Sequence, residues 1–210
     1  MPSKFRLRYI FRPLINKLAK ILGKIGLTPN YATAIMLILS FFCFIFLTVL
    51  KIEWLFGIFV FLVGIFDGVD GAIARFLKKE SKFGGFLDSI ADRFSEIIIF
   101  LAILLYFENQ KFWNLIEINI IIYISLGASL LISYARTRAQ NISLGDFDIG
   151  LMGRSERLVF ISISSILGWL WECLPIFMIL TVSTAIFRLV KAYSIIKKEE
   201  FLKSNSNSKF

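Results

Sequence analysis

Residues 67–92 read DGVDGAIARFLKKESKFGGFLDSIAD, and this stretch carries four aspartates between two long apolar runs. The first two aspartates are three positions apart and the last two are four apart, so each pair lies on one face of a helix. The apolar runs on either side predict two consecutive antiparallel helices, joined by a hairpin from Gly71 to Leu87. We therefore expect the two pairs to face each other. They are Asp67 and Asp70 before the hairpin, and Asp88 and Asp92 after it.

The composition of the chain predicts that these helices cross a membrane. Of the 210 residues, 57 % are apolar and only 19 % are charged, whereas a soluble domain has roughly 45–50 % apolar and about 25 % charged residues. Apolar stretches of about 20 residues span the roughly 30 Å hydrocarbon core of a bilayer. We expect an all-α integral membrane protein with six transmembrane helices, the last two separated by Pro175. The predicted spans are Tyr31–Leu50, Trp54–Arg75, Phe86–Phe107, Ile118–Ala135, Leu158–Leu174 and Ile176–Tyr193.

The basic residues predict the orientation of these spans. Every lysine and arginine except Lys51 and Lys111 falls on the side of the membrane that also holds both termini. Basic residues are enriched in short cytoplasmic loops, so this side is expected to be the cytoplasm, and the membrane the plasma membrane. The net charge of +9 therefore reflects topology and does not indicate nucleic-acid binding. Because the acids inside the spans gather at cytoplasmic ends, we expect a cytoplasmic active site.

The two ends of the chain differ from the predicted membrane domain of residues 31–196. Residues 1–30 place lysine and arginine among apolar positions with near-helical spacing, which predicts a basic amphipathic helix on the anionic membrane surface. The alternative is a helix that docks on the bundle and covers it. Residues 197–210 are polar and low in complexity, which predicts a disordered tail. The apolar positions of the first segment are Phe5, Tyr9, Leu14, Leu18, Ile21 and Ile25.

The four aspartates point to a metal site. Charged groups at membrane depth are costly and mark functional sites, and carboxylates held close together repel each other unless cations neutralise them. A set of oxygen ligands suits Mg²⁺ or Mn²⁺, and two ions are the usual device for phosphoryl displacement. The alternative is interfacial ion pairing with Arg75, Lys82 and Arg93. The chain has no histidine, which excludes histidine-ligated metals and Ser-His-Asp triads.

The same stretch resembles the signature of the CDP-alcohol phosphatidyltransferases, D-x-x-D-G-x-x-A-R, eight residues, then G-x-x-x-D-x-x-x-D. Every specified position is met in this chain. The resemblance implies a six-helix enzyme, a homodimer, that transfers a lipid phosphate from CDP-archaeol or CDP-diacylglycerol to a small alcohol and releases CMP.

The resemblance also implies roles for individual residues. It makes Asp67, Asp70, Asp88 and Asp92 ligands of Mg²⁺ or Mn²⁺, with two ions in the active site. Asp92 is in addition the catalytic general base that takes the proton of the acceptor hydroxyl. The implied contacts to the CDP-lipid are Asp67, Asp70, Gly71, Ala74, Arg75, Ser81 and Gly84.

Arginines later in the chain suggest the acceptor. Residues 133–140 (SYARTRAQ) and 153–157 (GRSER) resemble the branch of the family that makes phosphatidylinositol phosphate and archaetidylinositol phosphate. There a similar tract binds the phosphate of inositol 1-phosphate, so a phosphorylated polyol is the expected acceptor. Glycerol 3-phosphate is the alternative acceptor, and a cation transporter is the alternative without enzymatic activity. The arginines themselves could instead be positive-inside anchors. The expected acceptor-binding residues are Arg136, Arg138, Arg154, Arg157 and Arg188.

Overall fold

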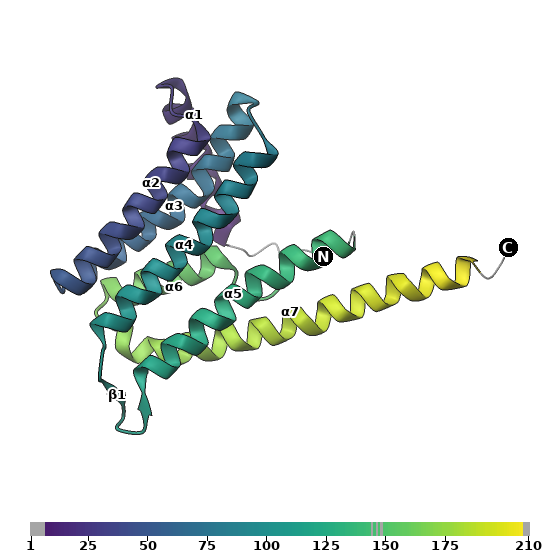
Figure 1. The fold of residues 1–210 in the computed structure, drawn as a ribbon. Coiled ribbons are helices and arrows are strands. Elements are labelled where there is room, and N and C mark those ends of the chain that lie inside the picture. The colour runs from purple at the N-terminus through teal and green to yellow at the C-terminus, as the bar shows by residue number, and fades with distance from the viewer. Residues whose placement is uncertain (1–6, 144, 146, 148, 208–210) are drawn as a thin grey trace.

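The computed structural model describes residues 7–143, 145, 147 and 149–207, most of which are helical (Figure 1). A short two-stranded antiparallel hairpin interrupts the helices between α4 and α5. The elements are α1 (Leu7–Lys24), α2 (Pro29–Phe44), the π-helical turn η1 (Ile45–Val49), α3 (Glu53–Leu77), α4 (Lys82–Tyr106), β1 (Lys111–Phe112), β2 (Ile116–Glu117), α5 (Ile118–Ile142), α6 (Arg154–Ile166) and α7 (Leu170–Asn207).

Four of the described helices are long and apolar enough to cross a membrane: α2 with η1, α3, α5 and α7. Helix α4 has 25 residues, but charged residues crowd its first half. Helix α6 has only 13 residues and is therefore about 20 Å long at 1.5 Å per residue, which is less than the roughly 30 Å of a bilayer core. The all-helical membrane character predicted from the sequence is thus confirmed, whereas six spans are not.

The boundary between the last two helices lies elsewhere than predicted. Pro175, which was expected to separate them, lies inside α7. The chain instead reverses at Gly168, whose φ of 70° favours glycine. The first backbone N–H of α7, on Leu170, donates to Glu53 Oε1 at 3.2 Å. A glycine with positive φ turns the chain, whereas a proline removes only one bond of the helical ladder.

Two further boundaries correct the predictions. The hairpin expected from Gly71 to Leu87 is mostly helical, and only residues 78–81 connect α3 to α4. Ser81 begins α4 by accepting a hydrogen bond from the backbone N–H of Gly84 at 3.0 Å. The tail predicted as disordered continues α7 as far as residue 207, because no glycine or proline follows Pro175 to end the helix. Residues 208–210 lie outside the described part of the chain.

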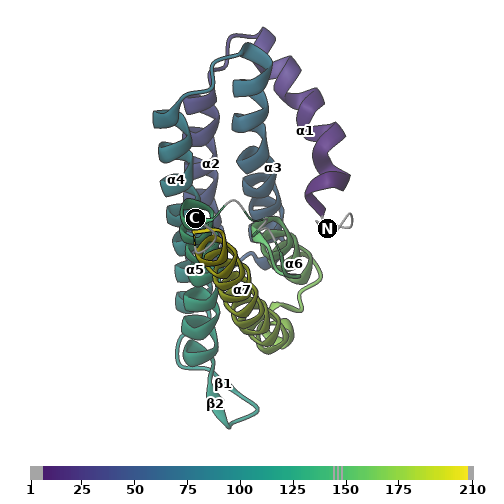
Figure 2. The ribbon, with the colours of Figure 1, turned by 90° about the vertical axis from the view of Figure 1, so that its right-hand side faces the viewer.

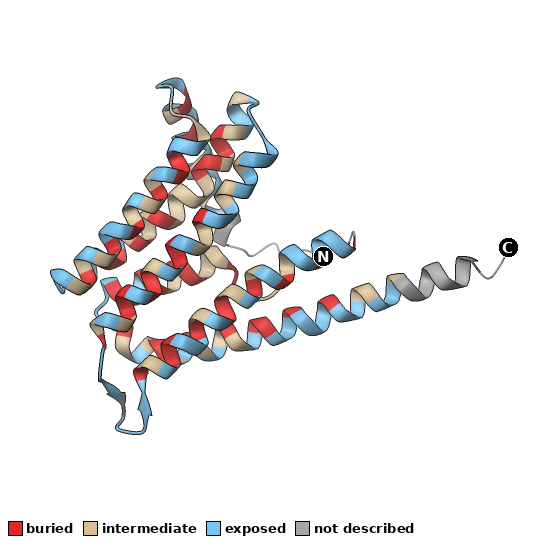
Figure 3. Ribbon diagram, in the orientation of Figure 1, coloured by how far each residue is buried: buried red, intermediate tan, exposed pale blue. Residues whose placement is uncertain are grey.

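Helix α2 packs between α3 and α4, which contact each other little (Figure 2). Helix α6 packs on α3, and α5 packs along α7. The core lies where these helices meet and includes Met36, Phe56, Phe100 and Phe177. Exposed residues cover the outer faces of the helices (Figure 3), and many of them are large and apolar. This distribution suits a protein whose outer surface faces lipid.

Helix α1 shows features of both alternatives considered for the N-terminal segment. One face docks on α3, where Ala19 is buried together with Val69 and Ala72. A second apolar face, which includes Leu14 and Ile21, is exposed. Phe5, part of the predicted apolar set, lies outside the described residues.

Candidate active site

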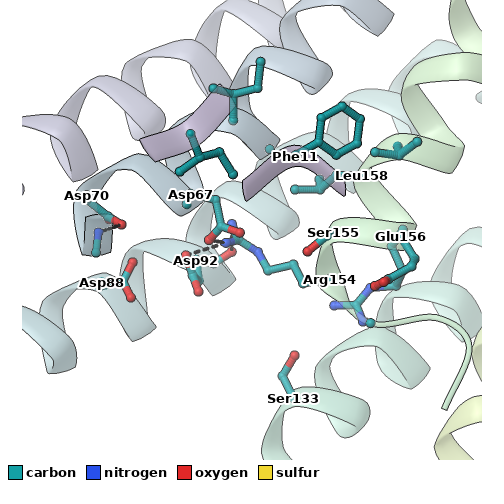
Figure 4. Close-up of a pocket in the computed structure, with 18 of the residues that line it drawn as sticks. Phe11, Asp67, Asp70, Asp88, Asp92, Ser133, Arg154, Ser155, Glu156 and Leu158 are labelled. Carbon is teal, nitrogen blue, oxygen red and sulfur yellow. Dashed lines mark hydrogen bonds and ion pairs between the residues drawn. The ribbon is translucent and has the colours of Figure 1, made fainter. Parts of the chain in front are cut away.

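A cavity of about 730 Å³ opens between α1, α3, α4, α5, α6 and α7. Its acidic wall consists of α3 and α4, and its arginine wall consists of α5, α6 and α7. Figure 4 shows Arg154 reaching from α6 to Asp67 and Asp92, with Asp70 and Asp88 nearby. The predicted residues that line the cavity are Asp67, Asp70, Gly71, Arg75, Asp88, Asp92, Arg136, Arg154, Arg157 and Arg188.

Three of the four aspartates form a group that fits a metal ion. Asp67, Asp88 and Asp92 each contribute one carboxylate oxygen, and these oxygens lie within 4.8 Å of one another. Asp88 Oδ1 is buried and has no hydrogen-bond partner among the described residues, which is costly unless a ligand supplies one. Carboxylate oxygens are the ligands that Mg²⁺ and Mn²⁺ prefer. The residues present therefore fit the expected cofactor.

Asp70 lies outside this group of three and is held by a hydroxyl group of α2. It is buried, and its Oδ2 accepts a hydrogen bond of 2.8 Å from Thr33 Oγ1 on α2. Sequence reasoning missed Thr33, because a single threonine in an apolar run gives no sign of its partner. The sequence shows only that Thr33 places a hydroxyl group one helical turn after Pro29, which does not reveal that its partner is Asp70.

Arg154 bridges the two walls. Its Nη1 donates to the carboxylates of Asp67 and Asp92, and its Nη2 donates to Ser95 Oγ at 2.7 Å and to the backbone carbonyl of Asp92 at 3.2 Å. The prediction placed Arg154 at the acceptor alone. In the structure its guanidinium contacts two of the expected metal ligands.

Two other predicted acceptor arginines are buried and bound to protein groups. Arg157 forms an ion pair with Glu96. Arg188 donates to the carbonyl of Ile149 at 2.8 and 3.0 Å and to that of Ile132 at 2.9 Å. Both arginines line the cavity, but their contacts also hold α6 and the segment before it in place.

Arg138 is the predicted acceptor residue that the structure does not bring to the cavity. It is exposed on α5, whereas Arg136 is half-buried and lines the cavity. Two successive steps of about 100° on a helix place these positions on opposite faces. In this structure Arg138 therefore lies outside the cavity that Arg136 lines.

Ala74, Ser81 and Gly84, predicted to contact the CDP-lipid, do not line the cavity. Ser81 and Gly84 contact each other at the start of α4. Gly71 and Arg75 do line the cavity, one turn apart on α3.

The sequence matches a known family and several of its members. Residues 26–192 match the family described as CDP-alcohol phosphatidyltransferase. The archaetidylinositol phosphate synthase of Pyrococcus horikoshii is 34 % identical over 166 residues, which cover 79 % of this chain and 82 % of that protein. The phosphatidylinositol phosphate synthase of Cutibacterium acnes is 29 % identical over 153 residues, covering 70 % and 69 % of the two chains.

Solved structures share the fold. The phosphatidylinositol phosphate synthase of Mycobacterium tuberculosis with CDP-DAG bound aligns with a TM-score of 0.69 at 24 % identity, covering 88 % of this chain and 94 % of that one. The same enzyme in complex with manganese and citrate gives a TM-score of 0.70 at 24 % identity, covering 87 % and 88 %.

Proposed function

Because this chain belongs to the CDP-alcohol phosphatidyltransferase family, we propose that it transfers the lipid phosphate of CDP-archaeol or CDP-diacylglycerol to inositol 1-phosphate and releases CMP. The observation that carries this proposal is the cavity in which an acidic wall faces an arginine wall. The named relatives, which are archaetidylinositol and phosphatidylinositol phosphate synthases, support the acceptor. Membership of an enzyme family excludes the cation transporter considered above.

The acidic wall accounts for the transfer. Asp67, Asp88 and Asp92 would hold two Mg²⁺ or Mn²⁺ ions together with Asp70, and bound metal neutralises negative charge on the diphosphate and on the leaving phosphate. Asp92 accepts the proton of the acceptor hydroxyl while the hydroxyl oxygen bonds to the lipid-side phosphorus. The bond from that phosphorus to the oxygen of CMP breaks.

Gly71 and Arg75 account for binding of the nucleotide end. Both lie on the α3 side of the cavity. Glycine lets the cytidine approach the backbone closely, and a guanidinium forms charge-assisted hydrogen bonds to phosphate. Contacts from Ala74, Ser81 and Gly84 stay predictions.

The arginine wall accounts for the choice of acceptor. Arg136, Arg154 and Arg188 come from three different helices and line one cavity. A phosphate monoester carries about −1.5 to −2 charges at neutral pH, and arginine recognises phosphate by paired hydrogen bonds. Inositol has no anionic group for these guanidinium groups, and zwitterionic serine offers only a carboxylate with a single negative charge.

We further propose that the chain crosses the membrane six times, through α2, α3, α4, α5, α6 together with the turn that follows it, and α7, with the charged first half of α4 turned to the cavity. Both termini and the active site then lie in the cytoplasm, as the basic residues predict. The homodimer implied by the family resemblance stays a prediction, which light scattering of the purified protein tests.

An acceptor panel tests the proposed reaction. Purified protein with Mg²⁺ and either CDP-lipid is given inositol 1-phosphate, glycerol 3-phosphate, inositol or serine, and CMP release is measured. Inositol 1-phosphate should be used at least about 10-fold more efficiently than inositol or serine, which lack the phosphate, the low end of what one charged hydrogen-bonding group contributes. The named relatives predict that it is also preferred over glycerol 3-phosphate. A preference for glycerol 3-phosphate would show that the proposed acceptor is wrong, and the transfer reaction of the family would still stand. Comparable use of free inositol or serine would overturn the role of the arginine wall.

A further inference from the structure

Beside the cavity lies a fully buried ion pair between Glu96 of α4 and Arg157 of α6. Glu96 is 2 % and Arg157 1 % exposed. Arg157 Nε donates to Glu96 Oε1 at 2.8 Å, and Nη2 donates to Oε2 at 3.0 Å. Nη1 donates to the backbone carbonyl of Met152 at 3.1 Å. The two charges therefore neutralise each other, and the proposed reaction gives neither of them a role.

This pair repeats the contact between Arg154 and Asp92 one helical turn further along. Glu96 follows Asp92 by four residues on α4, and Arg157 follows Arg154 by three on α6, so each helix carries its two positions on one face. Two ion pairs, Arg154 with Asp92 and Arg157 with Glu96, therefore join α4 to α6. The backbone of α6 packs closely on α3 and not on α4. The long side chains of the two ion pairs therefore connect α6 to α4.

The two ion pairs differ in whether substrate or metal can compete for their charged groups. Arg154 lines the cavity and contacts Asp67 and Asp92, two expected metal ligands, so substrate or metal must share these contacts. Arg157 also lines the cavity, but it is only 1 % exposed, and its guanidinium is held by Glu96 and by the carbonyl of Met152 rather than by an expected metal ligand. It also lies at the point where the chain enters α6, because the backbone N–H of Arg157 donates to the carbonyl of Gly153 at 3.0 Å.

We propose that Glu96 and Arg157 are positioning residues, which fix the start of α6 against α4 and so place Arg154 between the metal ligands and the acceptor phosphate. This inference rests on the proposed function, since it takes the acceptor to be phosphorylated. Stability alone does not explain the pair, because apolar residues of similar volume often serve as well as a buried ion pair. Geometry does explain it, since a bidentate pair between two helices fixes both distance and orientation.

Kinetics of Glu96→Gln test the proposal, because this change removes the charge and keeps the volume. The acceptor KM should rise about 10–100-fold, as expected for a displacement of about 1 Å near the reacting groups, while the KM for CDP-lipid stays unchanged. The matched control is Ser162→Ala, which removes an equally buried hydrogen bond of 2.8 Å from α6 to the carbonyl of Gly57 on α3. The control should lower thermal stability and leave the acceptor KM unchanged. An unchanged acceptor KM in Glu96→Gln, or an equal rise in both variants, overturns the proposal.

A second variant covers the case in which Glu96→Gln does not fold. Replacing both residues, Glu96→Leu with Arg157→Met, leaves no buried charge without a partner, so this protein should fold. It should show the same rise in acceptor KM. A normal KM in the double variant would mean that packing alone is needed there, and would refute a positioning role.

A distance measurement separates this inference from the proposed function. Spin labels replace the exposed Ile97 of α4 and Ile163 of α6, in a background that carries Cys43→Ala and Cys173→Ala. Pulsed electron paramagnetic resonance should give a broader distance distribution in Glu96→Gln and in the double variant than in Ser162→Ala. Equal distributions in all of them overturn the inference. A wild-type enzyme that rejects inositol 1-phosphate would instead refute the proposed acceptor, and the distances would still decide the positioning role.

Discussion

The acidic wall draws all four of its aspartates from one short segment of sequence, whereas the arginine wall collects its side chains from three helices. On the acidic wall, spacings of three and four residues already place each pair on one face. On the arginine wall such a spacing relates only Arg154 and Arg157, and the guanidinium groups differ in what they contact. Arg157 faces a carboxylate, Arg188 faces backbone carbonyls, and Arg138 faces away from the cavity.

This difference separates two kinds of information. A motif whose paired members lie about one helical turn apart can be recognised from local periodicity. A wall assembled across helices depends on helix rotation and on competing partners, which local spacing does not encode. The two walls should therefore respond differently to substitution, the acidic wall through metal and turnover and the arginine wall through acceptor binding.

The largest effect is expected on the acidic wall. Changing Asp67 or Asp88 to Asn removes a full charge from the group of three carboxylates, which should abolish CMP release and weaken Mn²⁺ binding measured by titration calorimetry. Near-normal turnover at ordinary Mg²⁺ in either variant would show that the group does not hold the catalytic metal.

Asp92→Asn should separate chemistry from binding on the same wall. Loss of a general base lowers turnover by about 10²–10⁴-fold, while binding of the CDP-lipid, followed by equilibrium dialysis, should persist. Lost affinity for the nucleotide with intact turnover would assign Asp92 to the CDP-lipid instead.

Arg136 and Arg138 provide a matched pair on the arginine wall, two residues apart on one helix. Arg136→Ala should raise the acceptor KM about 10–150-fold, which corresponds to about 1.5–3 kcal/mol for a charged hydrogen-bonding group. Arg138→Ala should leave it unchanged, because this side chain is exposed outside the cavity. Equal effects in steady-state CMP release would mean that both arginines act only through general surface charge.

The smallest effect is expected at Thr33, which supports the acidic wall from α2. Thr33→Val removes the hydrogen bond to Asp70 and keeps the shape, and loss of a residue that orients a metal ligand costs about 10–100-fold in metal affinity or activity. Thr33→Ser keeps the hydroxyl and should retain most of the activity. If valine and serine behave alike in Mn²⁺ titrations, the hydrogen bond does not orient Asp70.

The predicted helix ends were the least accurate part of the fold. Gly168 turns the chain, and Pro175 was mistaken for the break because both residues interrupt helices in sequence patterns. The tail after residue 196 was predicted as disordered from its polarity, although nothing in it ends a helix. Polarity tells whether a segment can be solvated, and it does not tell where a helix stops.

By itself, the sequence determined the helical membrane class, the acidic wall and the family, because apolar run length and the spacing of Asp67, Asp70, Asp88 and Asp92 are local properties of the chain. Only the tertiary structure decided which arginines reach the cavity, that Thr33 supports Asp70, and that Glu96 pairs with Arg157. These contacts join residues far apart in the chain, and they depend on how each helix is rotated against its neighbours. A one-residue change in that rotation turns a side chain by about 100°, which is enough to move an arginine from the cavity to the surface.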